Sequence, residues 1–75
     1  MSRMPRVTGK DTVTALLRAG MVKSHVRGSH FYLKWPNGVL LVCIPVHTGK
    51  TLRLGTLKNI LDQSGLSIDN FIDLL

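Results

Sequence analysis

The chain has 75 residues, a length that fits one domain with a small core and leaves little room for an enclosed active-site cavity. Ten Lys and Arg against four Asp give a formal net charge of +6, and no apolar stretch approaches the roughly 18 residues of a membrane span. A lone cysteine excludes an internal disulfide, and the basic N-terminus lacks the hydrophobic region of a signal peptide. We therefore expect a cytoplasmic protein without a membrane partner.

The charge is distributed unevenly. All ten basic residues and Asp11 lie within residues 1–61, whereas the other three aspartates lie within residues 62–75. A basic body of this density favours a polyanionic partner, because Lys and Arg replace the counterions that condense on phosphates. The alternative is a basic surface without a partner, and the high charge density favours a nucleic acid over it.

The first predicted element is a short amphipathic helix that follows a basic, loosely ordered lead over residues 1–7. Thr8 can cap a helix that begins at residue 9 or 10, and Gly20 can end it. Apolar residues of one helix face recur at the expected spacing, namely Val13, Leu16 and Leu17.

Three strands are predicted next. Residues 21–26 form the weakest, with Val22 and Val26 in phase, and a turn over residues 27–29 follows. Residues 30–35 alternate, so that one face carries Phe31, Leu33 and Trp35 and the other carries His30, Tyr32 and Lys34.

The third strand is predicted over residues 39–44, after the hairpin signal Pro36-Asn37-Gly38. This run is apolar on both faces, which is typical of a central strand, and Cys43 within it is expected to be a core residue rather than a nucleophile.

A loop over residues 45–53 leads to the remaining helices. The second helix is predicted over residues 56–64, with Gly65 as its stop and a buried stripe made of Leu57, Ile60 and Leu61. Ser67 can cap a final helical segment that carries Ile68, Phe71 and Leu74.

The order α-β-β-β-α with a helical tail predicts a single α+β domain over residues 1–75. Helices that pack on one face of a three-stranded antiparallel sheet leave the opposite face open to solvent. His30, Tyr32 and Lys34 are expected on that open face, where a protonatable ring, an aromatic ring and a cation would form an RNA-facing strip.

Nucleotide and metal sites are not expected. Gly49-Lys50-Thr51 resembles part of a phosphate-binding P-loop, but the required earlier glycine is replaced by Ile44. A zinc site needs clustered Cys and His, and a two-metal nuclease needs convergent carboxylates, whereas three of the four Asp lie in the acidic end. We expect no cofactor, and Lys50 and Arg53 in a basic loop are expected to contact phosphates.

RNA can be cleaved without a metal, because its 2′-hydroxyl can attack the adjacent phosphate. The reaction needs a group that transfers protons near neutral pH and cations that stabilise the phosphate. Histidine suits the first task, and His25, His30 and His47 are the candidates. His25 lies in the weakest strand, where it has the character of a solvated side chain. His47 precedes the basic loop, and His30 follows a glycine turn between Arg27 and Lys34. These observations alone leave the choice open.

Two segments carry a resemblance to a known family. Gly28-Ser29-His30 matches a Gly-Ser-His motif, and residues 45–52 (Pro-Val-His-Thr-Gly-Lys-Thr-Leu) continue into Gly55-Thr56-Leu57-Lys58-Asn59-Ile60-Leu61 and then Gly65-Leu66-Ser67. From about Gly9 to Phe71 the chain resembles the HicA family of bacterial toxin components. Phe31 departs from the second polar residue or histidine that often follows the motif histidine, so a two-histidine mechanism at this strand is not expected.

The resemblance implies a fold like the double-stranded RNA-binding domain, with His30 as the catalytic residue. It implies the toxin of a type II toxin–antitoxin system, an mRNA interferase that cleaves mRNA and arrests translation and growth. It also implies a HicB-type antitoxin that masks the His30 face, with no DNA binding except through that antitoxin.

The mechanism that we expect combines this resemblance with the charges near His30. Its imidazole would transfer a proton during 2′-hydroxyl attack, while Arg27, Lys34 and Lys23 hold the phosphate. The RNA-binding residues are expected to be Lys23, Arg27, Gly28, Ser29, Tyr32, Lys34, His47, Lys50 and Arg53. The alternatives are a non-catalytic RNA-binding module, which would use the same basic face to read A-form shape and phosphates, and a protein whose open face only docks a partner.

Overall fold

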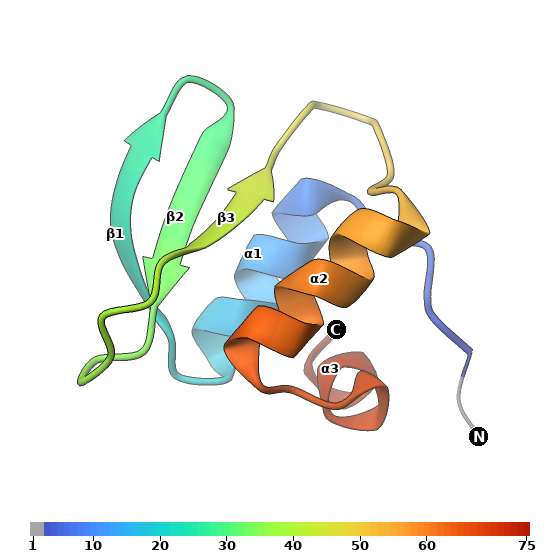
Figure 1. The fold of residues 1–75 in the computed structure, drawn as a ribbon. Helices are drawn as coiled ribbons and strands as arrows, with labels where there is room; N and C mark the ends of the chain where they lie inside the picture. The colour runs from blue at the N-terminus through green and yellow to red at the C-terminus, as the bar shows by residue number, and fades with distance from the viewer. Residues whose placement is uncertain (1–2) are drawn as a thin grey trace.

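The computed structural model describes residues 3–75 and has the predicted element order with helices on one side of a sheet (Figure 1). Its elements are α1 (Gly9–Arg18), β1 (Val22–Arg27), β2 (His30–Lys34), β3 (Val42–Pro45), α2 (Leu54–Ser64) and α3 (Ile68–Leu74). The strands form one antiparallel sheet in the order β1-β2-β3. The predicted α+β fold, with the layout of a double-stranded RNA-binding domain, is confirmed.

Local sequence signals set the helix boundaries. Thr8 and Asp11 form a capping box at the start of α1, in which the Asp11 backbone N–H donates to the Thr8 hydroxyl at 3.1 Å. Ser67 caps α3 by accepting from the Asn70 backbone N–H at 3.1 Å. Gly65 ends α2 in the left-handed conformation at φ 79°, as its position predicted. The start of α2 at Leu54 lies two residues before the predicted one.

The core lies between the helices and the covered face of the sheet. Its sheet side consists of Leu33, Val42 and Ile44, and the largest helix side chains are Leu16, Leu57, Ile60 and Phe71. The Trp35 indole donates its Nε1–H to the Ser64 carbonyl at 3.0 Å, which ties the end of β2 to the last turn of α2. Three predicted stripe residues of α2, namely Leu57, Ile60 and Leu61, are all buried.

Two details at the N-terminal side differ from expectation. Leu17 is exposed, and α1 instead buries Thr12 and Ala15 beside Val13 and Leu16. The predicted lead over residues 1–7 is anchored at its end, because Val7 is buried and its carbonyl accepts from the Leu52 backbone N–H at 2.8 Å. Residues 1–2 of that lead lie outside the described residues.

The third strand is not central, contrary to the prediction. β3 lies at an edge of the sheet and spans only residues 42–45, and Val39, in the preceding connection, is 96% exposed. Cys43 is half-buried and faces away from the core, because strand alternation turns Val42 and Ile44 inward. The apolar run therefore reflected an exposed loop and a one-sided strand rather than a strand buried on both faces.

The first strand contains a β-bulge. Lys23 pairs with Leu33 but His25 pairs with Tyr32, so Ser24 is the extra residue. The bulge reverses the alternation, and Val22 and Val26 point to opposite faces rather than sharing one as predicted. β1 is also the strand farthest from the helices in Figure 1, and all six of its residues are exposed.

Within residues 3–75, none of the helices has both the length and the apolar character needed to cross a lipid bilayer.

Candidate functional site

The open face of the sheet, defined as the surface opposite the helices, carries side chains in rows that cross the strands. Pairing partners in an antiparallel sheet point to the same side. The strand registers therefore place Arg27, His30 and Pro45 in one row and His25, Tyr32 and Cys43 in the next, followed by Val22 with Lys34. The predicted strip of His30, Tyr32 and Lys34 is present on this face.

His30 is the first residue of β2 and is exposed to solvent. It follows the two-residue turn Gly28-Ser29, in which Gly28 has a φ of 60°. A positive φ at the first central position is typical of a type II′ hairpin turn and favours glycine. Arg27 lies directly across the turn from His30, so a guanidinium group and an imidazole flank the same end of the sheet.

The residues after β3 lie at this same end. His30 pairs with Pro45, and one step further the Val46 backbone N–H donates to the Ser29 carbonyl at 2.7 Å. A groove of about 440 Å³ begins at Pro45 and is lined by Pro45, His47, Lys50, Thr51, Leu52, Arg53 and Thr56. The register thus brings the predicted basic loop next to His30, although the two are far apart in sequence.

Contacts with the start of α1 hold this loop in place. Thr51 forms a bridge with Thr8, and the Leu52 side chain is buried. Gly9 lies against the backbone of Pro45, where a Cβ atom would overlap the Pro45 carbonyl oxygen. The groove wall is therefore built on a close backbone contact that only glycine permits.

The middle row contains a stacked ring pair. The rings of His25 and Tyr32 have centroids 4.4 Å apart and planes 12° apart, and the Ser24 hydroxyl lies 3.1 Å from His25 Nδ1. A hydrogen bond with the Cys43 thiol raises the pKa of the Tyr32 phenol, and the nearby charge of Arg27 opposes the rise. Sequence reasoning left His25 out of the site because it lies in the weakest predicted strand, and strict alternation gives no sign of the bulge at Ser24.

Two predicted residues lie apart from His30. Lys23 pairs with Leu33 and therefore belongs to the other side of the sheet, at its exposed edge. Lys34 shares the open face but is four residues along β2, which is about 14 Å at the rise of an antiparallel strand. Arg27, which pairs with His30 across the turn, is thus better placed than these two lysines to meet a phosphate beside His30.

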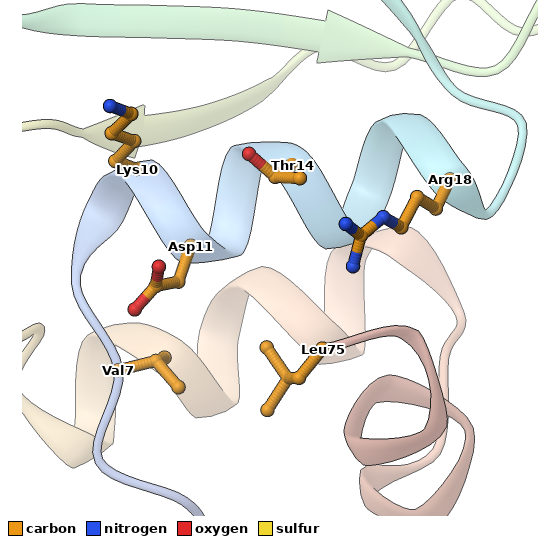
Figure 2. A pocket seen from close by; sticks show the side chains of 6 residues that line it. All are labelled: Val7, Lys10, Asp11, Thr14, Arg18 and Leu75. Atoms are coloured by element: carbon orange, nitrogen blue, oxygen red, sulfur yellow. The ribbon is translucent and has the colours of Figure 1, made fainter.

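A second hollow of about 430 Å³ lies between the N-terminal segment, α1 and the C-terminal residue (Figure 2). Its charged groups have structural partners, because Asp11 belongs to the capping box and Arg18 Nη1 donates to the Leu74 carbonyl at 2.8 Å. Lys10 points away from Asp11 and Leu75 in Figure 2. All three histidines of the chain lie outside this hollow, so it is a weaker candidate than the open face.

Potential metal ligands do not gather in the described part of the chain: residues 3–75 contain no group of three or more His, Cys, Asp or Glu able to hold a metal ion.

A family model described as the HicA toxin of bacterial toxin–antitoxin systems matches residues 9–66, from the start of α1 to just past the end of α2. No curated protein matches the chain. The match includes both segments that meet at the His30 end of the sheet.

Proposed function

The chain belongs to the HicA toxin family of bacterial toxin–antitoxin systems, and we propose that it acts as an mRNA interferase, a metal-independent endoribonuclease that uses His30. The observation that carries the proposal is the junction of the Arg27–His30–Pro45 row with the basic groove. An exposed imidazole and several cations at one surface are the groups that metal-free RNA cleavage requires.

The reaction proceeds on the RNA strand itself. His30 accepts the proton of a 2′-hydroxyl, the 2′-oxygen bonds to the adjacent phosphorus, and the bond from phosphorus to the 5′-oxygen breaks. The departing oxygen takes a proton from solvent. Arg27 stabilises the charge that builds on the phosphate, since it lies across the turn from His30. The products are a 2′,3′-cyclic phosphate and a 5′-hydroxyl.

The remaining predicted contacts extend the RNA-binding surface on both sides of His30. His47, Lys50 and Arg53 in the groove contact phosphates on one side, and Tyr32 and Lys34 contact the RNA along β2 on the other. Gly28 and Ser29 shape the turn between them, and their small size leaves the phosphate room to approach. Lys23, at the sheet edge, contributes only to the general positive field.

The antitoxin is the second partner. A HicB-type protein that covers the open face would block RNA at His30 and need not alter the fold. The toxin–antitoxin setting also favours a ribonuclease over the two alternatives, because neither a passive RNA-binding module nor a docking surface by itself accounts for toxicity that an antitoxin must neutralise.

The proposal is tested by expressing the wild-type chain and His30→Ala in parallel and by incubating both purified proteins with mRNA. Growth arrest and cleavage are expected only for the wild type, with cyclic phosphate ends, in the presence of EDTA and on RNA but not DNA. Fragments with 5′-phosphates, dependence on a divalent cation, or equal cleavage by His30→Ala would refute it. RNA binding without cleavage by the wild type would identify the non-catalytic module.

A further inference from the structure

The stacked pair of His25 and Tyr32 has no role in the cleavage step described above, although it lies on the open face one row from His30. Tyr32 is two residues after His30 on the same strand, so the pair begins about 7 Å from the proposed catalytic residue. An aromatic surface so close to the cleavage point can act on the nucleotide next to it.

The β-bulge is what creates this pair. If the pairing of Lys23 with Leu33 continued without a break, Ser24 would face Tyr32 and His25 would lie on the helix side. The extra residue turns His25 to the open face, and bulges commonly re-aim a side chain in this way.

One face of the His25 ring is covered by Tyr32, and the other faces the sheet edge. β1 is an edge strand, none of the strands within residues 3–75 pairs with its outer side, and His25 is exposed. On the inner side, Tyr32 pairs with Cys43 of β3 in the strand register. The tyrosine therefore lies between two strands, and the histidine presents its outer ring face at the exposed edge.

Charges around the pair favour a nucleic acid as its ligand. Arg27, on the neighbouring strand, lies in the row before that of Tyr32. Lys34, on the same strand as Tyr32, lies in the row after it. Aromatic rings between cations on a sheet surface are the arrangement with which proteins bind unpaired bases, since the bases stack while the backbone phosphates meet the cations.

From these observations we infer that His25 and Tyr32 form a base-binding subsite, in which an unpaired nucleobase next to the cleaved phosphate stacks on the open face of His25. This inference rests on the proposed function and adds a substrate requirement to it. The enzyme selects single-stranded RNA, because a base inside a helix cannot offer its face to a protein ring.

The test measures binding, so that it does not depend on cleavage. His30→Ala serves as the parent protein, and the probe is a fluorescent single-stranded RNA 12-mer together with versions that carry one abasic nucleotide at each position in turn. The variants are His25→Leu, which removes the aromatic face, and His25→Phe, which keeps it. Lys23→Gln is the matched control from the other side of β1, and thermal unfolding verifies that each variant is folded.

We expect His25→Leu to weaken binding about 5- to 140-fold, the range of one base–aromatic stack, and His25→Phe to stay close to the parent. One abasic position should cause a similar loss in the parent but no further loss in His25→Leu. Independent, additive losses, or unchanged binding by His25→Leu, would overturn the subsite.

The outcome is separable from that of the proposed function. If His25→Leu binds RNA like the parent while the wild type still cleaves, the subsite is wrong and the ribonuclease stands. If the wild type does not cleave but the His25 losses appear as expected, the subsite stands and catalysis is wrong. Loss of antitoxin binding by His25→Leu with RNA binding intact would assign the pair to protein docking and overturn the inference.

Discussion

His30 lies opposite Pro45 in the register between β2 and β3, and the hydrogen bond from Val46 to Ser29 extends that pairing by one residue. This relationship joins the Gly28-Ser29-His30 turn to the segment that carries His47, Lys50 and Arg53. Two stretches that are separate in sequence therefore form one end of the molecule, with the catalytic candidate at their junction.

The groove cations should determine RNA affinity through charge. Replacement of Lys50 and Arg53 by glutamine removes two phosphate contacts, and each contact to a single strand contributes about 0.7 to the slope of log K against log salt. We expect weaker binding at low salt and a slope reduced by about 1.4 for the double variant. Fluorescence anisotropy across a salt series measures both quantities.

Lys23→Gln provides the control for this series, because it removes a cation from the other side of the sheet. Its slope should change by much less than that of the Lys50 and Arg53 double variant. An equal effect of Lys23→Gln would mean that only the net charge matters and that the groove has no special role.

Gly9 should be intolerant of any side chain. A Cβ at this position overlaps the Pro45 carbonyl oxygen, and neither the Gly9 Cα in α1 nor the Pro45 backbone in β3 can easily move away. Overpacking of this kind costs about 1–3 kcal/mol, so we expect Gly9→Ala to lower the free energy of unfolding by that amount. Urea denaturation measures it, and Gly55→Ala, at a helical position with open space around it, should not be destabilised.

The fold could be predicted largely from local signals. The hydroxyls of Thr8 and Ser67 cap helix starts, and Gly65 ends α2 because it has no side chain to oppose the left-handed conformation. The alternation of residues 30–34 directly gives the two faces of β2. The position of β3 could not be obtained in this way. Exposure of Val39 and the edge location of the strand depend on which elements pack together, which periodicity does not report.

The site, like the fold, could be predicted only where local signals determine it. Residues of one strand, such as His30 and Tyr32, share a face by alternation alone. The proximity of His30 to the groove depends on the β2–β3 register, and the recruitment of His25 depends on the bulge at Ser24. Lys23 was grouped with Arg27 because both are cations near one turn, and the same bulge separates them.

The phenol of Tyr32 should have a pKa above its ordinary value, and Tyr32 is the only tyrosine of the chain. The hydrogen bond with Cys43 raises the pKa of its phenol above the ordinary value of 10.0, and Arg27 opposes the rise. Cys43→Ala should therefore lower the pKa of Tyr32, whereas Arg27→Gln should raise it further. Absorbance of tyrosinate at 295 nm reports this one residue without interference from other tyrosines.

The direction of the linked stability change follows from that shift. A raised pKa means that the folded state holds the phenol proton more tightly than the unfolded chain. The associated stabilisation is complete below pH 10.0, the ordinary phenol value, and is lost as the pH rises through the higher folded value. Identical titration of Tyr32 in the wild type and in Cys43→Ala would contradict the hydrogen bond as the cause.

The antitoxin should protect the open face from chemical modification. His25, His30 and His47 are all exposed, so diethyl pyrocarbonate should modify the three imidazoles of the free protein. If a HicB-type antitoxin covers the face that binds RNA, its addition should suppress modification of His30 most strongly, and peptide mass spectrometry resolves the three sites. Lys58, which pairs with Asp62 on the exposed side of α2, is the reference for uncovered surface when an amine-specific reagent is used. Protection of Lys58 with continued modification of His30 would show that the antitoxin binds the helices, and that it neutralises the toxin without masking the proposed catalytic residue.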